Sequence, residues 1–572
     1  MTTDAPTPAN PQDRLTRWLP WIVGIALALP SLLARYLPMS DLSLHEGVVG
    51  VLRHFNDESY FPRGLYVLNL GHPNQLFHVT GWLLSLVVPT DWAVKIVIAT
   101  AQLLIFVTGA RLADHLGRSR WSVILLAPLA LGFTYYWGLV ANLLGYVTFL
   151  LALPTIDKNA VHPTLRATLQ TCGLMLLLYF AHESVFAMAA GVVGLFALCY
   201  PLRPKQTALR LAPAFFAAAV AFLQFVWGSR LFTGGQLRPP PRYFSFGTRF
   251  TALPNVLFGS HEIAAQLLLI GLALSCIAAL LVTRIREPRN TVVAHVDDPP
   301  ESSTPLHRAR TFLRAHRFEA VVVVFFVAYF VAPFSFNGAT LIHERFLGPG
   351  WAILAVCIAP RGAPHRLAKI FASVLPLGIL LLAWPQFLDA DRSNRDLDVL
   401  FGKIPRGGTV ALCAADRLAV RTRVYSGASA VSRSLAVIGG RTGLALVTSP
   451  ISPVQINPEL RWDEFDRRMT IYTSRAIKPA HDLRMFEWIV GQSRQPETRR
   501  IMIEAFAPDA DLVAAQGEWM LFHSKYPIVP IMSPEPPLPP GLDSILDRLV
   551  FLARRDYNAA HPEDPLPEAP AP

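Results

Sequence analysis

Charged residues are scarce in this chain of 572 residues: they make up 16% of it, whereas 52% of the residues are hydrophobic. The mean hydropathy is +0.37. Such values are typical of proteins with several membrane-spanning helices and exclude an ordinary large soluble enzyme. The scarcity of charge therefore predicts that a lipid bilayer surrounds much of the chain.

Cysteine is rare as well. The chain holds five, and none belongs to a CxxC pair. Four of them, Cys172, Cys199, Cys276 and Cys357, fall in or beside apolar segments, and Cys413 stands alone. This spacing excludes a disulfide framework and a cysteine-based metal site. An A-x-A-like cleavage site is lacking after the first apolar segment, so we expect that segment to be a retained anchor.

Acidic residues are under-represented in the first part of the chain. Residues 1–386 hold 29 Lys and Arg against 17 Asp and Glu, whereas the tail from residue 387 holds 22 against 23. The basic excess thus lies in the loops between apolar segments, as membrane orientation requires. This patterning does not suggest nucleic-acid binding.

Eleven apolar segments could cross roughly 30 Å of hydrocarbon. They lie near residues 19–37, 93–110, 121–136, 143–156, 168–181, 185–200, 211–228, 263–283, 318–333, 347–360 and 369–386. A twelfth candidate, residues 75–89, is interrupted by His78. The predicted fold class is therefore a polytopic α-helical membrane protein with about 11 transmembrane helices.

The basic loops decide how residues 75–89 are placed. The loops 111–120, 200–210, 283–317 and 360–369 carry three, three, seven and three Lys or Arg. They share one side only if residues 75–89 do not cross, and cytoplasmic loops are the ones enriched in Lys and Arg. We therefore expect a cytoplasmic segment 1–18, a transmembrane domain 19–386 and a surface helix at 75–89. That helix belongs to a long first periplasmic loop, residues 38–92.

With eleven crossings, the tail falls in the periplasm of a bacterium whose inner membrane holds the protein. Short β-like runs at 409–413, 435–439, 444–447, 486–490 and 511–522 predict a small α/β domain over 387–525. Residues 526–572 read as a proline-rich linker, an amphipathic helix and a disordered end. We expect that helix to pack on its own domain, with the membrane surface as the alternative.

Polar residues gather at one side of the predicted membrane domain. They are Asp41, His45 and Glu46 after the first span, His72 in GHPNQ, Asn142 in TYYWGLVANLLGY, His182 and Glu183 in FAHES, and His343, Glu344 and Arg345 in LIHERFLG. Charged groups near lipid are costly and tend to mark function. Structural roles remain open: Asp41 as a helix N-cap, His182 with Glu183 as an interfacial pair, and Arg345 as an interface anchor or partner of Glu344.

The layout resembles the GT-C superfamily of membrane glycosyltransferases. The shared features are an acid directly after the first helix in a long outer loop, a His-Pro segment leading into a surface helix, and a late arginine at an outer helix end. The resemblance covers about residues 15–386, and the tail matches a common C-terminal periplasmic domain. Members include oligosaccharyltransferases, protein O-mannosyltransferases and aminoarabinose transferases.

The resemblance implies roles for two residues. An acid at the place of Asp41 acts as general base or orients the acceptor, and Arg345 matches the basic residue that steadies the phosphate of a polyprenyl-phosphate-linked sugar. Some members carry a second acid that helps to bind a divalent metal such as Mg²⁺ or Mn²⁺. The second outer loop here has none, although Glu46 or Glu183 could substitute. The metal ligands are therefore unknown.

Three functions are compatible with the sequence. The first is an inverting glycosyltransferase that moves a sugar from a polyprenyl-phosphate donor to a periplasmic lipid, glycan or protein of the envelope. The second is a transporter or flippase for a lipid-linked saccharide. Charged residues near the midplane of the helices and two matching halves would favour it; the sequence has few of the former and no internal repeat. The third is a non-catalytic membrane protein of envelope assembly.

The topology predicts the outcome of reporter fusions. Alkaline phosphatase fused after Phe387 is expected to be active, because the enzyme folds in the periplasm, and a fusion near Thr304 is expected to be inactive. Activity measured on whole cells checks both. An active fusion near Thr304 would invert the topology and every site assignment with it.

Overall fold

The computed structural model describes most of the chain: residues 11–201, 203–231, 240–259, 261–286, 305–335, 340–414, 452–457, 477–530, 533, 544–563 and 565–567. Its contacts divide into two compact units. The first, here called the helical unit, comprises residues 1–33, 98–135 and 140–384. The second, the mixed unit, comprises residues 34–97, 136–139 and 385–572.

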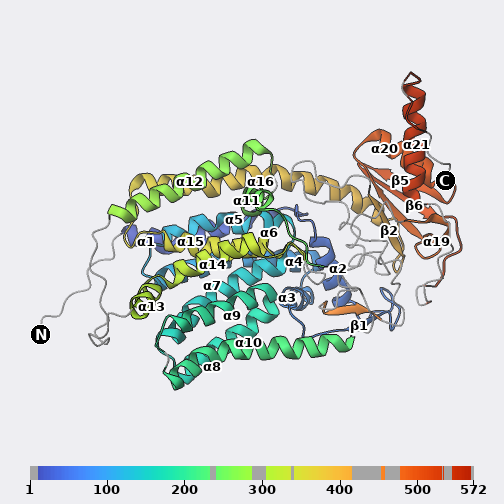
Figure 1. The fold of residues 1–572 in the computed structure, drawn as a ribbon. Helices are drawn as coiled ribbons and strands as arrows, with labels where there is room; N and C mark the ends of the chain where they lie inside the picture. The colour runs from blue at the N-terminus through green and yellow to red at the C-terminus, as the bar shows by residue number, and fades with distance from the viewer. Residues whose placement is uncertain are drawn as a thin grey trace, which may run out of the picture. The chain divides into compact units, whose positions relative to one another are not determined.

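Long helices build the helical unit (Figure 1). They are α1 (Pro11–Leu33), α4 (Thr90–His115), α7 (Val140–Val161), α8 (Leu165–Ala181), α9 (Glu183–Leu198), α10 (Pro204–Leu231), α11 (Phe246–Phe258), α12 (Ile263–Arg286), α13 (Pro305–Ala315), α14 (Arg317–Val331), α15 (Glu344–Cys357) and α16 (Arg366–Phe401). In the described residues, six helices are long and apolar enough to cross a membrane. The polytopic helical fold is confirmed, and ten of the eleven predicted spans each fall mainly within one helix.

The prediction of one span over 121–136 is wrong. This stretch forms a 3-10 helix (Arg120–Leu126) and two single turns, α5 (Ala127–Ala130) and α6 (Phe133–Tyr136). The break falls at Gly132, where a Cβ would collide with the carbonyl oxygens of Pro128 and Leu257. The backbone of α11 approaches so closely that a regular helix with side chains could not continue there.

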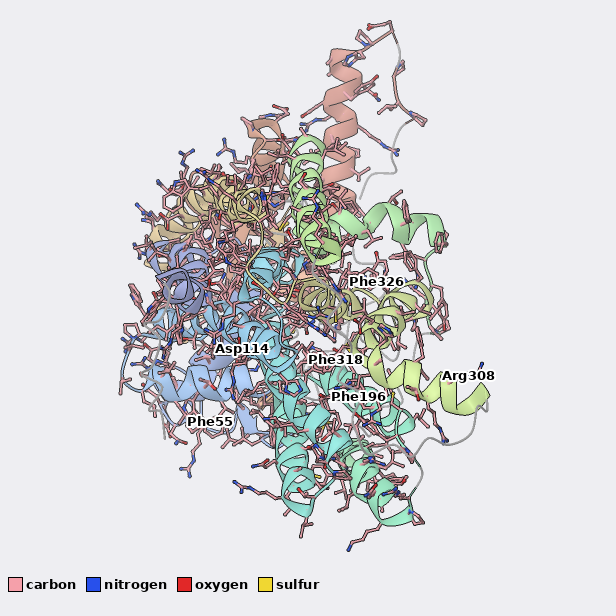
Figure 2. The ribbon with its side chains drawn as sticks, turned by 90° about the vertical axis from the view of Figure 1, so that its left-hand side faces the viewer. Phe55, Asp114, Phe196, Arg308, Phe318 and Phe326 are labelled. Atoms are coloured by element: carbon pink, nitrogen blue, oxygen red, sulfur yellow. The ribbon has the colours of Figure 1, made fainter. Side chains whose placement is uncertain are left out.

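The core of the helical unit is mainly apolar, and an ion cluster lies near the ends of three of its helices. Phe196 of α9 packs edge-on against Phe318 of α14, with ring centroids 5.1 Å apart (Figure 2). Close by in the chain, Arg317 opens α14 and donates to the carboxylate of Asp157 in α7, at 2.9 Å from its Nη2. His115, at the end of α4, lies 2.8 Å from the same carboxylate.

The first loop belongs to the mixed unit and forms two helices, α2 (Leu42–Arg53) and α3 (Leu76–Ser85). They pack closely, because Gly81 leaves room for Val49, which a Cβ there would meet at 3.2 Å. The structure confirms a helix within 75–89 as a separate element. The loop also supplies β1 (Tyr66–Leu68), which pairs antiparallel with β3 (Val454–Ile456) of the tail.

The tail forms a four-stranded sheet of order β2-β4-β6-β5. Its strands are β2 (Val410–Ala414), β4 (Trp488–Gln492), β5 (Ala510–Gln516) and β6 (Trp519–Ser524), with β2 and β4 parallel and the other pairs antiparallel. The run predicted at 511–522 is in fact a hairpin, because Gly517 adopts a φ of 56° and turns the chain. The predicted runs at 435–439 and 444–447 lie outside the described residues.

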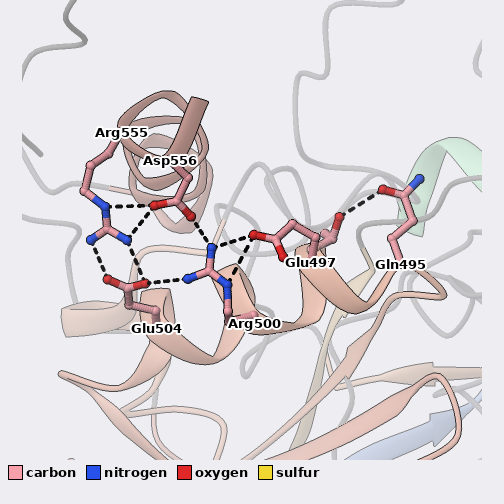
Figure 3. Close-up of polar contacts among 7 residues, drawn as sticks. Gln495, Glu497, Arg500, Glu504, Arg555 and Asp556 are labelled. Carbon is pink, nitrogen blue, oxygen red and sulfur yellow. Dashed lines mark hydrogen bonds and ion pairs between the residues drawn. The ribbon is translucent and has the colours of Figure 1, made fainter. Parts of the chain in front are cut away.

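The amphipathic helix near the C-terminus is α21 (Ile545–Ala560), and it packs on its own domain as its leucine spacing predicts. Ile545 and Leu552 are buried in a core with Phe506 of α20 (Pro496–Phe506). On the exposed side, Arg500 of α20 bonds Asp556, and Arg555 bonds Glu504 (Figure 3). Exposed pairs of this kind contribute little to stability, so the apolar contacts stabilise the packing.

Candidate functional site

The ten candidate residues fall into two groups. Asp41, His45, Glu46 and His72 belong to the mixed unit, and Asn142, His182, Glu183, His343, Glu344 and Arg345 belong to the helical unit. Each group has its own geometry. That both groups face one cavity remains a prediction.

Asp41 occupies the N-cap position of α2 but does not act as a cap. Its side chain makes no capping hydrogen bond. Its backbone is held instead: Asp41 N donates to the carbonyl of Trp137 at 3.2 Å. Gly138, at a φ of 76°, allows this approach, because a Cβ there would lie 2.7 Å from Asp41 N. Gly138 of the TYYWGLVANLLGY motif thus positions Asp41, whose carboxylate is not used as a cap.

His45 pairs with a histidine that the sequence analysis had not listed as a site residue. Its Nδ1 lies 2.9 Å from Nε2 of His78 in α3. Burial lowers the pKa of His45 to about 4, against a smaller effect of a hydrogen bond to the Gly138 backbone. Burial, and then the nearby His45, hold the pKa of His78 well below its usual value. The pair is therefore neutral near pH 7, and one ring donates to the other.

Among the residues that the structure describes, no charged side chain pairs with the Asp41 carboxylate. Burial raises the pKa of the Asp41 carboxyl to about 7. A carboxyl with such a pKa exchanges its proton readily near neutral pH, which suits a general base or acid. Perturbed pKa values of this size are common at functional sites.

Glu46 and His72 are buried side chains of the same mixed unit. Glu46 lies five residues beyond Asp41 on α2 and is 8% exposed. His72 is 1% exposed and sits in a turn that Gln75 organises, since Gln75 Oε1 accepts from the backbone of Gly71 and His72. Asn74 adopts a φ of 64° in this turn. The GHPNQ segment therefore sets the start of α3, the helix that carries His78.

Arg345 opens α15 and contacts Glu183, not Glu344. Its Nη1 lies 3.9 Å from Glu183 Oε1, and its Nη2 donates to the carbonyl of Thr340 at 3.2 Å. Within the described residues, its buried Nε has no hydrogen-bond partner. The Glu183 side chain is 44% exposed, and an ion pair at that distance and exposure is weak. The guanidinium thus retains donors for another anion.

His182 places a further donor beside this guanidinium. Its Nδ1 accepts from the backbone N–H of Ser184 at 3.2 Å, so the proton of the neutral ring resides on Nε2. That Nε2 lies 3.4 Å from Arg345 Nη1. In this tautomer the two N–H groups cannot bond each other, and an acceptor beside both could bind to each. Burial, reinforced by the Arg345 charge, keeps the pKa of His182 well below its usual value.

Tyr146, one turn beyond Asn142 on α7, meets the first turns of α15. Asn142 is 1% exposed, and Tyr146 Oη lies 3.1 Å from Oγ1 of Thr134. Gly348 leaves room for the ring, since a Cβ there would lie 2.5 Å from Tyr146 Oη. The glycine of LIHERFLG thus lets α7 approach the turn that carries Arg345. The spacing of Tyr146 four residues after Asn142 could have indicated this neighbour.

His343 and Glu344 form a separate buried pair. His343 Nδ1 lies 2.9 Å from Glu344 Oε2, and the side chains are 1% and 8% exposed. Aromatic rings surround the histidine, with Tyr329 at 5.3 Å and Phe244 at 5.8 Å between centroids. Their enclosure indicates a role in shaping the start of α15 near Arg345.

An apolar cavity of about 640 Å³ lies between α9 and α14. Its lining is almost wholly hydrophobic and includes Glu183 and Leu198, the two ends of α9, with Phe346 directly after Arg345. At 1.5 Å per residue, the helix alongside it is on the order of 24 Å long. The cavity therefore has a long apolar lining that includes Glu183 and Phe346, the chain neighbours of His182 and Arg345.

The described residues do not offer a ligand set for a metal ion. No three His, Cys, Asp or Glu side chains among them gather as one metal centre would require. Glu46 and Glu183, the substitutes that the sequence suggested, belong to different units. We therefore assign no step to a metal.

Comparison with solved structures identifies the fold. The chain is similar to ArnT from Cupriavidus metallidurans, crystallised with undecaprenyl phosphate, at a TM-score of 0.51 and 11% identity over 90% of this chain and 98% of that one. It is also matched to the archaeal oligosaccharyltransferase AglB from Archaeoglobus fulgidus, in complex with an inhibitory peptide and a dolichol-phosphate, at 12% identity over 89% and 75%. The TM-score of that match, 0.38, is too low to support an argument. No family model and no curated protein matches the sequence.

The fold is thus similar to that of ArnT, which agrees with the resemblance stated from the sequence. At 11% identity the likeness shows the fold alone. It does not transfer a substrate or a catalytic residue to this chain.

The contact between Gly348 and Tyr146 predicts the effect of a small substitution. Gly348→Ala adds a methyl group against a rigid ring, so it should destabilise the protein by about 1–3 kcal/mol. Adding Tyr146→Leu should restore much of that loss by removing the ring. Thermal unfolding in detergent checks this, and a pair of additive losses would contradict the contact.

Proposed function

We propose that the chain is a glycosyltransferase of the bacterial inner membrane that moves a sugar from a polyprenyl-phosphate donor to an acceptor in the periplasm, where its tail also lies. The observation that carries the proposal is the pair of nitrogens of Arg345 and His182, 3.4 Å apart, whose chain neighbours Phe346 and Glu183 line an apolar cavity. A polyprenyl phosphate has the matching chemistry, an anionic head on a long hydrocarbon.

The donor cluster suits a phosphate for two reasons. Arg345 keeps its charge at any physiological pH and presents several N–H groups in a plane, which can bind phosphate oxygens in bidentate fashion. His182 adds a neutral N–H, because its Nδ1 is already an acceptor. Asn142 and Tyr146 are close neighbours along α7, and we infer that they border the same head group.

The apolar cavity suits the hydrocarbon. Val321 and Phe325 of α14 and Met188 of α9 line it, and Glu183 and Phe346 bring it to Arg345. The similar structure of ArnT was obtained with undecaprenyl phosphate, a lipid of this class. The phosphate would then lie at the membrane boundary, with the chain in hydrocarbon.

In the proposed step, Asp41 accepts the proton of an acceptor hydroxyl. The hydroxyl oxygen attacks the anomeric carbon of the sugar as the bond from that carbon to the phosphate oxygen breaks. The polyprenyl phosphate leaves as an anion, and Arg345 with His182 stabilises the charge that develops on it. A single displacement of this kind inverts the anomeric carbon. The neighbouring His45–His78 pair holds the loop that carries Asp41.

Arg345 allows a direct test of phosphate binding. Arg345→Lys keeps the charge but loses the planar arrangement of donors, so undecaprenyl phosphate should bind at least roughly tenfold more weakly, in line with one charge-assisted hydrogen bond. Titration of the purified protein in detergent measures this. Arg242→Lys, at an exposed arginine, is the control. Unchanged binding in both Arg345→Lys and Arg345→Ala would assign Arg345 a structural role.

Asp41 allows a test of the chemistry itself. Asp41→Asn keeps the shape but cannot accept a proton, so transfer should fall by on the order of 10² to 10⁴ with normal membrane insertion. Because the pKa of Asp41 is about 7, wild-type transfer should rise as the pH passes through 7 and level off above it. Asp57→Asn, at an exposed acid of the same loop, is the control.

The readout is sugar transfer from a labelled lipid fraction to envelope acceptors. It is compared among deletion strains that each carry the wild-type protein or one variant. Full transfer by Asp41→Asn would remove the catalytic assignment. It would favour a membrane protein that binds the lipid-linked sugar without transferring it.

A further inference from the structure

Helix α13 lies directly before the apolar helix α14 in the chain. A single residue, His316, separates the two helices. Where α14 begins, Arg317 binds Asp157 of α7, and His115 at the end of α4 binds the same carboxylate. Beyond this point α14 exposes Val323 and Val327, at 62% and 53%, as a helix in lipid does. The ion cluster therefore lies where the exposed apolar surface of α14 begins, and α13 ends two residues before Arg317, at Ala315.

Helix α13 has one arginine against the protein and its large apolar side chains exposed. The Arg314 guanidinium lies 5.0 Å from the ring centroid of Tyr200. Its apolar side is left open, with Phe312 64% and Leu313 36% exposed. An apolar face that points away from the protein at the bilayer boundary is covered by lipid.

The charge of α13 selects the kind of lipid. Arg308 is exposed and points away from Phe318 and Phe196 of the neighbouring helices (Figure 2). Arg310 is half-buried on the same helix. The α10 helix begins with a second basic group, where Lys205 is exposed close to Arg203 in the chain. Such a basic, amphipathic surface attracts anionic lipid head groups.

We propose that α13 is an interfacial helix, with Phe312 and Leu313 inserted among the acyl chains and Arg308 bound to the phosphates of anionic lipids. By the charge rule this leaflet is the cytoplasmic one. The assignment does not depend on the proposed transferase activity. It explains why the most basic loop of the chain, residues 283–317, ends in a helix with an open apolar face.

Nitroxide labels on the full-length protein test the placement. Cys172, the half-exposed cysteine, is replaced by serine, since the other four are buried. One variant then carries the label at Phe312→Cys. The matched control carries it at Thr311→Cys, which faces about 100° away on the helix. Each is reconstituted in nanodiscs of phosphatidylcholine alone and of phosphatidylcholine with phosphatidylglycerol at about 3:1, chosen here as compositions.

Collisions with oxygen, which concentrates in hydrocarbon, and with a water-soluble nickel chelate report the depth of the label. In the anionic nanodiscs, the label at 312 should be relaxed mainly by oxygen and the label at 311 mainly by nickel. Arg308→Gln should lower the ratio of immersed to water-exposed label at 312 by roughly fivefold. This is the change expected when one arginine no longer binds an anionic surface. In phosphatidylcholine alone, this substitution should have little effect.

Three results would overturn the proposal. Strong nickel relaxation at 312 in both lipids would place the apolar face in water. Protection of 312 from both reagents, in nanodiscs and in detergent, would mean that protein covers it. An equal response of the Arg308 variant in both lipids would remove the anionic head group from the assignment.

Discussion

The hydrocarbon of a bilayer accepts no hydrogen bonds, and this constraint organises the helical unit. Polar side chains must find partners within the protein or lie where helices end. Asp157, Arg317 and His115 satisfy one another at one set of helix ends. Around Arg345 and His182 the hydrogen-bonding groups are incompletely paired. Two donors lie side by side, and Glu183 forms only a weak ion pair with Arg345. A protein tolerates such an arrangement at low cost where an anionic ligand completes it.

Burial also governs the chemistry of Asp41, in the loop that follows the first helix. A carboxylate near the membrane boundary would ordinarily be paired, capped or hydrated. Asp41 has a held backbone and a side chain that caps nothing, beside a histidine pair that carries no charge near neutral pH. Its pKa therefore rises to the range where proton transfer is efficient. Burial acts on both Asp41 and Arg345, but Arg345 has Glu183 as a distant ionic partner.

Much of the fold followed from hydropathy, and the exceptions have local causes. The apolar run at 121–136 is long enough to cross a membrane, but the close approach of the α11 backbone at Gly132 breaks it. The run at 511–522 has the composition of one strand, yet Gly517 turns it into a hairpin. Hydropathy averages over a window and does not register one glycine. The pairing of β1 with β3 joins residues almost 400 positions apart and has no signal in a single sequence.

The sequence by itself determined that lipid surrounds much of the protein, which residues could take part in chemistry, and which family its layout resembles. These properties depend on composition, spacing and charge, which are additive along the chain. Only the tertiary structure decided that His78 pairs with His45, that Arg345 contacts Glu183 and not Glu344, and that Tyr146 fits against Gly348. Each of these depends on which helix faces approach one another, and packing sets that.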